Sequence, residues 1–306
     1  MAPANDSNSP ADQTSGPGAG PGAGPGPGPE PAPVDGPVLV TGGTGTLGRP
    51  LVDELLADGV PVRVMSRHPR PAEDERPCEW AVCDLTKGVG LAAAVSGVRA
   101  IVHCATDQRR EAKVLSRVVE AAQQAGVPHL VYISIVGVDQ VPLPYYKAKF
   151  ASERLLENSG LPYTILRATQ FHDLVARVTT AQRRLPFVLS PAGFRCQPVE
   201  VTEVAHRLAE LVRGEPAGRV PDMGGPAVHT ARGLAEATLR TTGRSRRVVD
   251  LPLPGRTARA FRRGGNLAPD HATGTVTFAE FLAARRPGRP EPSRITPPGD
   301  RPESAG

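Results

Sequence analysis

The feature that most constrains the fold is an apolar run that ends in a glycine-rich loop and continues as an amphipathic segment. The stretch "PVLVTGG" is typical of a buried strand, and "TLGRPLVDELLADG" has apolar residues at helical spacing. Glycines at this junction let backbone N–H groups approach a pyrophosphate, at which a helix beginning near Thr46 would aim the positive end of its dipole. The segment therefore predicts a dinucleotide-binding βαβ unit with loop contacts from Gly42, Gly45, Thr46, Leu47 and Gly48.

The alternation of β-rich runs and helical stretches continues to about residue 169. Further strands are predicted at "PVRVMSR", "CEWAVCDL", "RAIVHCAT", "HLVYISIVG" and "PYTILRAT", and helices at "REAKVLSRVVEAAQQAG" and "YYKAKFASERLLENSG". Such alternation implies a parallel sheet covered by helices on both faces. Right-handed crossovers then give a Rossmann-like, doubly wound α/β fold with ligands at the carboxyl ends of the strands.

The sequence beyond Thr169 is less regular. The stretch "VEVTEVAHRLAELVRG" predicts one clear helix and "TARGLAEATLRTTG" a second, whereas the rest is short and interrupted by Pro. We expect a smaller, irregular C-terminal part from about residue 170, lying over the sheet, where a substrate lid would be built.

Both ends of the chain have a composition that does not support a core. Residues 1–36 contain "GPGAGPGAGPGPGPEPAP", and residues 286–306 are similarly rich in Pro and polar residues. Such segments bury too little apolar surface to offset the entropy lost on ordering. We therefore expect two disordered tails around a folded part of residues 37–285.

The composition also bears on location and metal binding. No basic segment followed by an apolar run suggests a secretory signal, and no run approaches the roughly 18 apolar residues of a membrane span. We therefore expect a cytoplasmic protein with no membrane partner. Structural zinc and a disulfide framework are not expected, because the four cysteines form no CxxC pair and have no His at ligand spacing: Cys78, Cys83, Cys104 and Cys196.

One stretch of the C-terminal part is strongly basic. Nine arginines fall between Arg232 and Arg263, against only Glu236 and Asp250. A basic patch can bind nucleic acid or another anionic partner. No helix-turn-helix signal and no basic stretch interleaved with aromatic residues supports nucleic-acid binding, so a solvated surface is the favoured interpretation. A protein partner or a homodimer stays open.

The end of the second predicted strand bears on which dinucleotide is bound. An NAD site has a carboxylate there that accepts a hydrogen bond from the ribose 2′-hydroxyl. This chain instead has Ser66 and Arg67, with Arg70 close behind. A hydroxyl and a guanidinium suit a 2′-phosphate, because Arg donates charge-assisted, bidentate hydrogen bonds to it. The segment favours NADP(H) over NAD(H); the alternative is that Arg67 is an ordinary surface residue.

Several motifs together resemble one known family. The stretches "TGGTGTLG", "CDL", "YISIVGVD", "YYKAKFASERLL" and "TILRATQFHD" are similar to the short-chain dehydrogenase/reductase superfamily, and within it to the atypical, NmrA-like NAD(P)H-binding branch. The resemblance covers roughly residues 37–285 and implies a Rossmann fold that binds NADP(H) or NAD(H). It also implies that Asp84 and Leu85 approach the adenine and that Ala105 lies along the cofactor. The alternative for Asp84 is a turn or helix cap.

The candidate acid–base pair lies in "PYYKAK". Reduction of a carbonyl by a hydride needs a proton donor, and a phenol with a pKa of about 10 serves at neutral pH only if its anion is stabilised. Tyr145 and Lys149 are four residues apart and share one helix face. The Tyr-x-x-x-Lys pattern of the superfamily selects Tyr145 over Tyr146, with Lys149 lowering the phenol's pKa and holding the cofactor ribose. The alternative is that the tyrosines pack the helix start and the lysines are solvated.

A third catalytic element is expected at the end of the fifth strand. Ser134 is positioned to hydrogen-bond a substrate carbonyl, although Ile135 follows where many relatives have a second hydroxyl. The gap of 11 residues to Tyr145 is also short for the superfamily. The alternative is that Ser134 satisfies the backbone at the strand end.

Residues near other strand ends are weaker candidates. His103 lies in a buried strand and is expected to be a core or cofactor-side histidine, and Arg167 is expected to pair structurally at the sheet end. Residues after the sixth strand fall where the family places cofactor- and substrate-facing loops, and they are the tentative substrate contacts: Gln170, Phe171 and His172.

The sequence leaves three functional hypotheses. The first is an NADP(H)-dependent oxidoreductase acting on a small carbonyl, enone or quinone. The second is a non-catalytic NAD(P)H-binding sensor of the NmrA type that contacts a regulator. The third, less favoured, is a sugar-nucleotide epimerase or dehydratase.

Overall fold

The computed structural model describes residues 35–126, 129–241 and 246–285, so the predicted tails lie almost wholly outside the described residues. Within the described part, seven parallel strands form one sheet in the order β3-β2-β1-β4-β5-β6-β9. The strands are β1 (Val38–Thr41), β2 (Val62–Ser66), β3 (Glu79–Val82), β4 (Ala100–His103), β5 (His129–Ile135), β6 (Tyr163–Ala168) and β9 (Gly218–Arg219).

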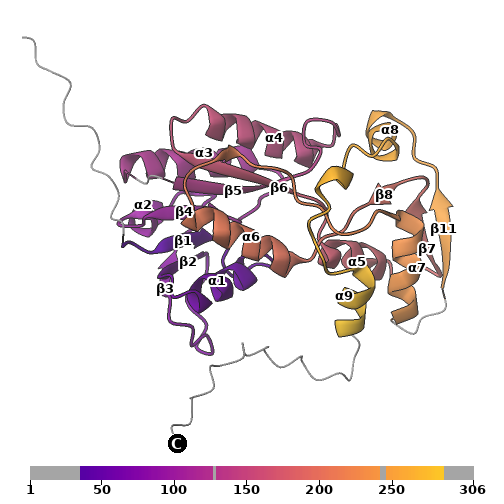
Figure 1. Ribbon diagram of the computed structural model, residues 1–306, viewed down its shortest axis with the longest axis horizontal. Coiled ribbons are helices and arrows are strands. Elements are labelled where there is room, and N and C mark those ends of the chain that lie inside the picture. The colour runs from indigo at the N-terminus through magenta and orange to yellow at the C-terminus, as the bar shows by residue number, and fades with distance from the viewer. Residues whose placement is uncertain (1–34, 127–128, 242–245, 286–306) are drawn as a thin grey trace, which may run out of the picture. The chain divides into compact units, whose positions relative to one another are not determined.

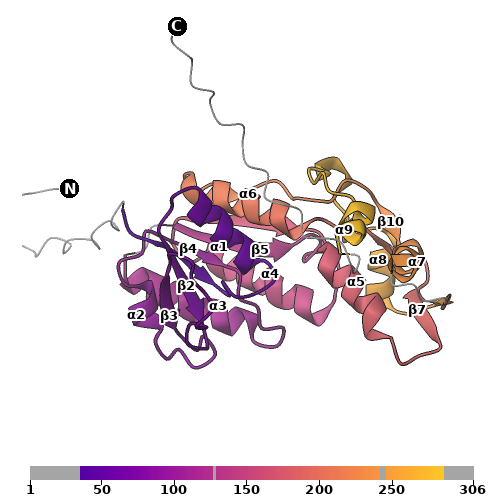
Figure 2. The ribbon, with the colours of Figure 1, turned by 90° about the horizontal axis from the view of Figure 1, so that it is seen from below.

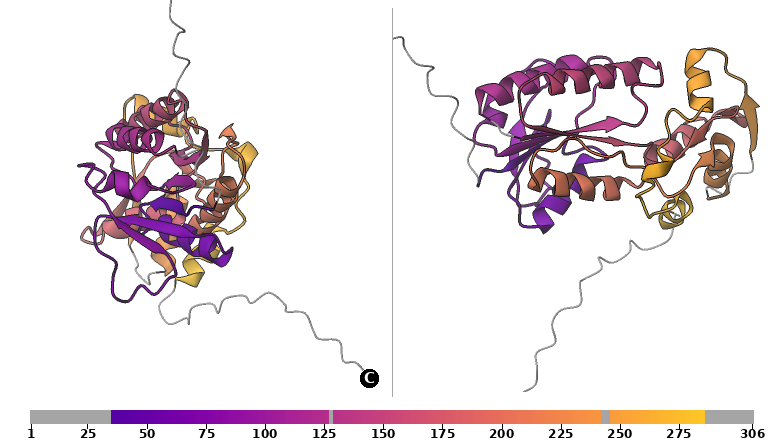
Figure 3. Two further views of the ribbon diagram at one scale, coloured as in Figure 1. Left: turned by 90° about the vertical axis from the view of Figure 1, so that its left-hand side faces the viewer. Right: turned by 45° about the horizontal axis from the view of Figure 1, so that its top comes forward.

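Helices cover both faces of the sheet, so the predicted Rossmann-like fold is confirmed. One face packs against α1 (Gly48–Ala57) and α6 (Val201–Arg213), and the other against α2 (Leu91–Val95), α3 (Glu111–Gln124) and α4 (Pro144–Glu157) (Figures 1 and 3). Each strand contributes to both layers, because successive side chains of a strand point to opposite faces of the sheet. Val38 and Val40 of β1 join the cluster of α1 and α6, whereas Leu39 joins that of α3.

A smaller region follows β6. It contains two short strand pairs, parallel β7–β11 and antiparallel β8–β10. Figures 1 and 2 show its helices beyond the end of the sheet at which β6 leads into α5. The elements are α5 (His172–Ala181), β7 (Phe187–Pro191), β8 (Arg195–Cys196), β10 (His229–Thr230), α7 (Ala231–Thr241), β11 (Arg247–Leu251), α8 (Arg256–Arg262), a 3₁₀ turn (Pro269–His271) and α9 (Phe278–Ala284).

The part after residue 170 differs from the expectation in one respect. The chain returns to the sheet through α6 and β9, so these residues do not form one continuous region over it. The cause is the apolar face of α6, where Val204, Leu208 and Val212 are buried in the same cluster as the strands. β9 then pairs with β6 and extends the sheet by a seventh strand.

The glycine loop is tightly packed at the start of α1. The helix begins at Gly48, two residues later than predicted, and Gly42 has a φ of 66° in the left-handed region. A Cβ on Gly48 would lie 2.1 Å from the Gly42 carbonyl oxygen and 2.6 Å from the Cα of Gly43. Only a glycine at position 48 lets the helix start come so close to the loop.

We therefore expect Gly48→Ala to lower the free energy of unfolding by about 1–3 kcal/mol, because the added methyl group overpacks the loop. Gly214→Ala is the matched control. Its φ is −83°, and its Cβ would meet nothing nearer than 3.6 Å, so we expect a change within about 0.5 kcal/mol. Urea unfolding of both variants measures the difference, and equal midpoints would contradict the packing argument.

Among the described residues, no helix combines the length and the apolar character needed to cross a membrane.

Candidate functional site

The glycine loop meets the loop that follows β4. A Cβ on Gly42 would lie 2.8 Å from the backbone nitrogen of Ala105, and that nitrogen donates to the Thr41 hydroxyl at 3.2 Å. The structure thus brings two predicted cofactor residues, Gly42 and Ala105, side by side at the carboxyl ends of β1 and β4. Gly45 and Thr46 are exposed, whereas the Leu47 side chain is buried in the core.

Next to this junction, Tyr145 belongs to a chain of hydrogen bonds. Its phenol oxygen lies 2.8 Å from the Thr106 hydroxyl, which lies 3.0 Å from Oε2 of Glu111. The other carboxylate oxygen of Glu111, Oε1, lies 2.7 Å from Nζ of Lys149. The predicted pair Tyr145 and Lys149 is therefore joined through two residues that sequence reasoning missed.

The hydrogen bonds in this chain have a defined direction. An ionised carboxylate only accepts hydrogen bonds, so the Thr106 hydroxyl donates its single hydrogen to Glu111. The Thr106 oxygen can then only accept, and Tyr145 is the donor in their contact. Oε2 of Glu111 also accepts from the backbone N–H of Asp107 at 2.9 Å, which fixes the carboxylate against the loop.

Lys149 and Glu111 form a buried ion pair, with side chains 4% and 1% exposed. Burial alone would raise the pKa of Glu111, but the Lys149 charge holds that pKa below its usual value. Burial would likewise lower the pKa of Lys149, but Tyr132, Glu111 and Tyr145 together raise that pKa. Both groups are therefore ionised at neutral pH.

Further contacts compensate the buried charges. Nζ of Lys149 donates to the Ile133 carbonyl at 3.0 Å and lies 4.5 Å from the centre of the Tyr132 ring. The Tyr132 hydroxyl donates to Oε1 of Glu111 at 3.0 Å. The ammonium therefore has contacts with the Glu111 carboxylate, the Ile133 carbonyl and Tyr132.

The sequence carries a signal for Glu111. In the predicted helix, Glu111 precedes the apolar positions Val114, Leu115 and Val118 by three, four and seven residues, which places a carboxylate on the buried face. A carboxylate is rarely fully buried without a partner. Thr106 has no comparable signal, because it is an exposed hydroxyl in a loop.

The structure does not bring Ser134 or His103 into this chain. The Ser134 side chain is buried, and its hydroxyl has no hydrogen-bond partner among the described residues. Nδ1 of His103 lies 2.9 Å from the Thr41 hydroxyl, and its Nε2 has no described partner. Burial lowers the pKa of His103 to about 4, so the ring is neutral at pH 7, as suits the predicted core or cofactor-side histidine.

The residues at the ends of β2 and β3 differ in whether their side chains already have hydrogen-bond partners. Arg67 is exposed and has no hydrogen bond or ion pair with any described residue. Ser66 accepts a hydrogen bond from the His68 N–H at 3.2 Å. Asp84 accepts from both the N–H and the hydroxyl of Thr86, at 2.9 and 2.6 Å, which is the turn role left open by the sequence, and Leu85 is largely buried.

The three tentative substrate residues connect β6 and α5 to the C-terminal region. Gln170 donates to the Asn266 carbonyl at 3.2 Å, and Phe171 packs against the core. The His172 ring is fully buried against Phe278 and Phe281. In this position His172 has no exposed surface for a substrate, because its ring packs α9 against α5.

Two other sequence expectations concern charge and cysteine. Arg167 pairs with Glu153 at 2.6 Å and with Asp139 at 3.0 Å, so its predicted structural pairing is confirmed. In the basic stretch, Arg232 pairs with Asp250 and Glu236 at the surface. All four cysteines are free thiols, and no described group of His, Cys, Asp and Glu side chains could hold a metal ion.

These features define a Rossmann-fold nucleotide-binding protein with a phenol at the cofactor end of its sheet. Residues 42–213 match the profile of a family described as NAD(P)H-binding, and the chain belongs to this family. The predicted resemblance to atypical, NmrA-like short-chain reductases is thereby confirmed.

Relatives within the family have different functions. The chain is 27% identical to the photosystem II assembly factor Ycf39 of Trieres chinensis, over 71% of this chain and 72% of that one. It is 30% identical to the chloroplastic divinyl chlorophyllide a 8-vinyl-reductase of Oryza sativa subsp. indica, over 71% of this chain and 61% of that protein. Among solved structures, the NADPH complex of the quinone oxidoreductase QOR2 from Escherichia coli shares the fold, with a TM-score of 0.70 and 21% identity over 80% of this chain and 98% of that one.

The ion pair gives a prediction about stability. Glu111→Gln keeps the shape of the side chain but leaves the Lys149 ammonium buried without a countercharge, so we expect a loss of about 3–5 kcal/mol in the free energy of unfolding. Glu120→Gln, on the exposed face of the same helix, is the matched control, with an expected change below about 0.5 kcal/mol. Urea denaturation distinguishes them, and equally small effects would rule out the buried pair.

Proposed function

We propose that this protein is an NADP(H)-dependent oxidoreductase that reduces a small carbonyl, enone or quinone. The observation that carries the proposal is the hydrogen-bond chain from Tyr145 through Thr106 to the buried pair of Glu111 and Lys149. This chain fixes the Tyr145 phenol beside the glycine loop. The Tyr145 side chain is half-buried and can be reached from solvent. A proton donor in that position is what hydride transfer to an oxygen-bearing substrate requires.

The residues present fit a bound dinucleotide. Gly42 and Gly48 let the loop pack closely against Ala105 and the start of α1, and Gly45 is exposed beside them. Arg67, with no described partner, is available for a 2′-phosphate, whereas Lys149 is 4% exposed and its contact with a ribose hydroxyl stays a prediction. NADPH, when bound, supplies the hydride.

The proton for the substrate oxygen comes from Tyr145. Its O–H turns from Thr106 to the substrate and gives up the proton, which leaves a phenolate. The Thr106 hydroxyl can then turn from Glu111 and donate to that phenolate, while Asp107 still holds the carboxylate. The Lys149 ammonium at the far end of the chain balances the charge of the Glu111 carboxylate, so the phenolate does not face an unpaired anion. Solvent returns the proton to the half-buried phenol.

A non-catalytic role is the second candidate, and one observation favours it. Ser134, expected to orient the substrate oxygen, has no hydrogen bond to Tyr145 or Lys149 among the described residues. Relatives named as assembly factors also occur in this family. Such a protein would bind NADP(H) and transfer no hydride.

Substitution of the phenol separates these candidates. In a catalytic protein, Tyr145→Phe should lower kcat for NADPH oxidation with a quinone and carbonyl panel by about 100-fold or more, because the proton donor is lost. The NADPH Kd should stay within about twofold, since the hydroxyl contributes no binding group in this scheme. Stopped-flow absorbance and fluorescence titration measure the two quantities.

Tyr163→Phe is the control. It removes the same hydroxyl at the first residue of β6, at the end of the sheet opposite the glycine loop. It should leave both values unchanged. Unchanged turnover in Tyr145→Phe would remove the acid–base role, and absence of any turnover in the parent protein would favour the non-catalytic candidate.

Cofactor choice is tested at Arg67. Arg67→Ala should weaken NADPH binding by about 10- to 100-fold, because a charge-assisted hydrogen bond to the 2′-phosphate is lost. NADH lacks that phosphate and serves as the internal control, so its Kd should change by less than about twofold. Equal losses for both dinucleotides in calorimetric titrations would refute the preference for NADP(H).

A further inference from the structure

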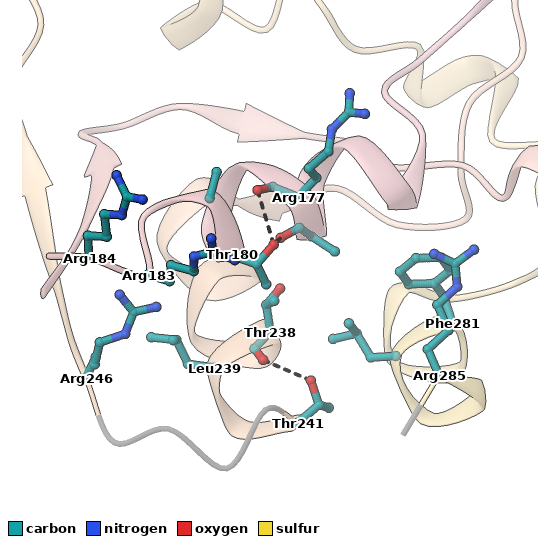
Figure 4. A pocket seen from close by; sticks show the side chains of 13 residues that line it. Arg177, Thr180, Arg183, Arg184, Thr238, Leu239, Thr241, Arg246, Phe281 and Arg285 are labelled. Carbon is teal, nitrogen blue, oxygen red and sulfur yellow. Dashed lines mark hydrogen bonds between the residues drawn. The ribbon is translucent and has the colours of Figure 1, made fainter. Parts of the chain in front are cut away.

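An arginine-lined groove lies in the C-terminal region. It has a volume of about 780 Å³ and is formed by α5, α7, α9 and the chain around residues 183–184 and 246 (Figure 4). This volume falls within the range of small-molecule sites, about 300–1,000 Å³. Among the described residues that line it, none is acidic and five are arginines: Arg177, Arg183, Arg184, Arg246 and Arg285.

The arginines are only partly neutralised. Arg285 pairs with Asp173. In contrast, the side chains of Arg177, Arg183 and Arg184 make no hydrogen bond or ion pair with any described residue. Figure 4 shows Arg183, Arg184 and Arg246 gathered at one end of the groove, while the Arg177 side chain points away from that end.

Arg246 is held in place by the backbone. One of its terminal nitrogens donates to the Gln182 carbonyl at 2.7 Å and to the Leu185 carbonyl at 3.2 Å. Its Nε is buried and has no hydrogen-bond partner among the described residues. These two carbonyls fix the Arg246 guanidinium without neutralising its charge, at the same end of the groove as the exposed Arg183 and Arg184 (Figure 4).

The rest of the groove is lined by alanine, leucine and threonine side chains. Leu239 and Leu282 are less than 10% exposed, Ala176 adds a further apolar surface, and the Arg285 guanidinium lies over the Phe281 ring. The hydroxyls of Thr238 and Thr180 are engaged with backbone carbonyls. The groove therefore combines an apolar lining with a cationic end.

We propose that this groove binds a small amphiphilic anion with a phosphate group on an apolar body. The phosphate would contact Arg183, Arg184 and Arg246, since guanidinium groups donate paired hydrogen bonds to phosphate oxygens. The apolar body would lie against Ala176 and Leu239. None of the lining residues belongs to the glycine loop or the Tyr145 chain, so the site is independent of the proposed oxidoreductase function.

The test is calorimetric titration of the full chain with n-octyl phosphate, inorganic phosphate and n-octanol, each with and without saturating NADPH. Octyl phosphate should bind about tenfold or more tightly than inorganic phosphate, because only it fills the apolar part. Octanol should not bind measurably. Binding should weaken as salt rises and should be unaffected by NADPH.

The double variant Arg183→Gln/Arg184→Gln should weaken octyl phosphate binding by about tenfold or more, since two charge-assisted contacts are lost. The control Arg240→Gln/Arg247→Gln removes the same charge from exposed residues of α7 and β11 outside the lining. Its affinity should change by less than about twofold. Thermal unfolding of both variants checks that each still folds.

Three outcomes would overturn the proposal. Equal effects of the two double variants would indicate attraction by net charge alone. Loss of octyl phosphate binding when NADPH is added would place the ligand at the glycine loop. Binding of a hexaglutamate peptide without binding of octyl phosphate would make the groove a contact surface for acidic protein segments.

Discussion

The buried ion pair between Glu111 and Lys149 is the interaction on which the site depends. It joins the first residue of α3 to the middle of α4, and Lys149 also donates to β5 through the Ile133 carbonyl. Removing two charges from water is costly unless good geometry and further hydrogen bonds compensate it. Here the Glu111 carboxylate also accepts hydrogen bonds from the Tyr132 and Thr106 hydroxyls and from the Asp107 N–H. Any shift of α3 against α4 would separate these partners, so the pair fixes where the α4 start presents Tyr145.

The pair also determines what each nearby group can do. Because Glu111 is ionised, Thr106 must donate to it, and the Tyr145 hydroxyl is in turn directed to Thr106. Lys149 is therefore joined to the phenol only through the hydrogen-bond chain, and its closest charged partner is Glu111. His103, neutral because burial lowers its pKa to about 4, adds no competing charge to this end of the sheet.

The parts of the fold that were predictable have local signals. The glycine loop, the parallel strands up to Tyr163–Ala168 and the helix that carries Tyr145 and Lys149 each show a period of two or 3.6 residues or a turn motif. β9 has two residues and therefore no period, and only its pairing with β6 defines it. The place of α6 was also missed, because an amphipathic pattern shows that a face is buried but not against which partner.

The same limit explains the candidate site. Helical spacing relates Lys149 to both Tyr145 and Tyr146, and the Tyr-x-x-x-Lys pattern of the resemblance pointed to Tyr145. The contact of Tyr145 with Thr106 spans 39 residues and that of Lys149 with Glu111 spans 38. Such contacts depend on how α3 and α4 lie on the sheet. His172 shows the converse limit: its position after a strand suggested a substrate contact, whereas the structure places its ring against Phe278 and Phe281 of α9. The position of a residue along a strand predicts at which end of the sheet it lies. The direction of its side chain depends on tertiary packing.

The cost of the network bears on whether the protein catalyses or only binds. A dinucleotide-binding protein needs the glycine loop and a group for the 2′-phosphate, and neither requires a buried carboxylate. Apolar residues at positions 111 and 149 would pack α3 against α4 with similar or better stability, since buried ion pairs are often less stabilising than apolar replacements of similar volume. The chain nevertheless keeps both charges, with a hydrogen-bond path from them to a solvent-accessible phenol. A charged path that stability does not require, ending at a group able to donate a proton, favours chemistry over cofactor sensing.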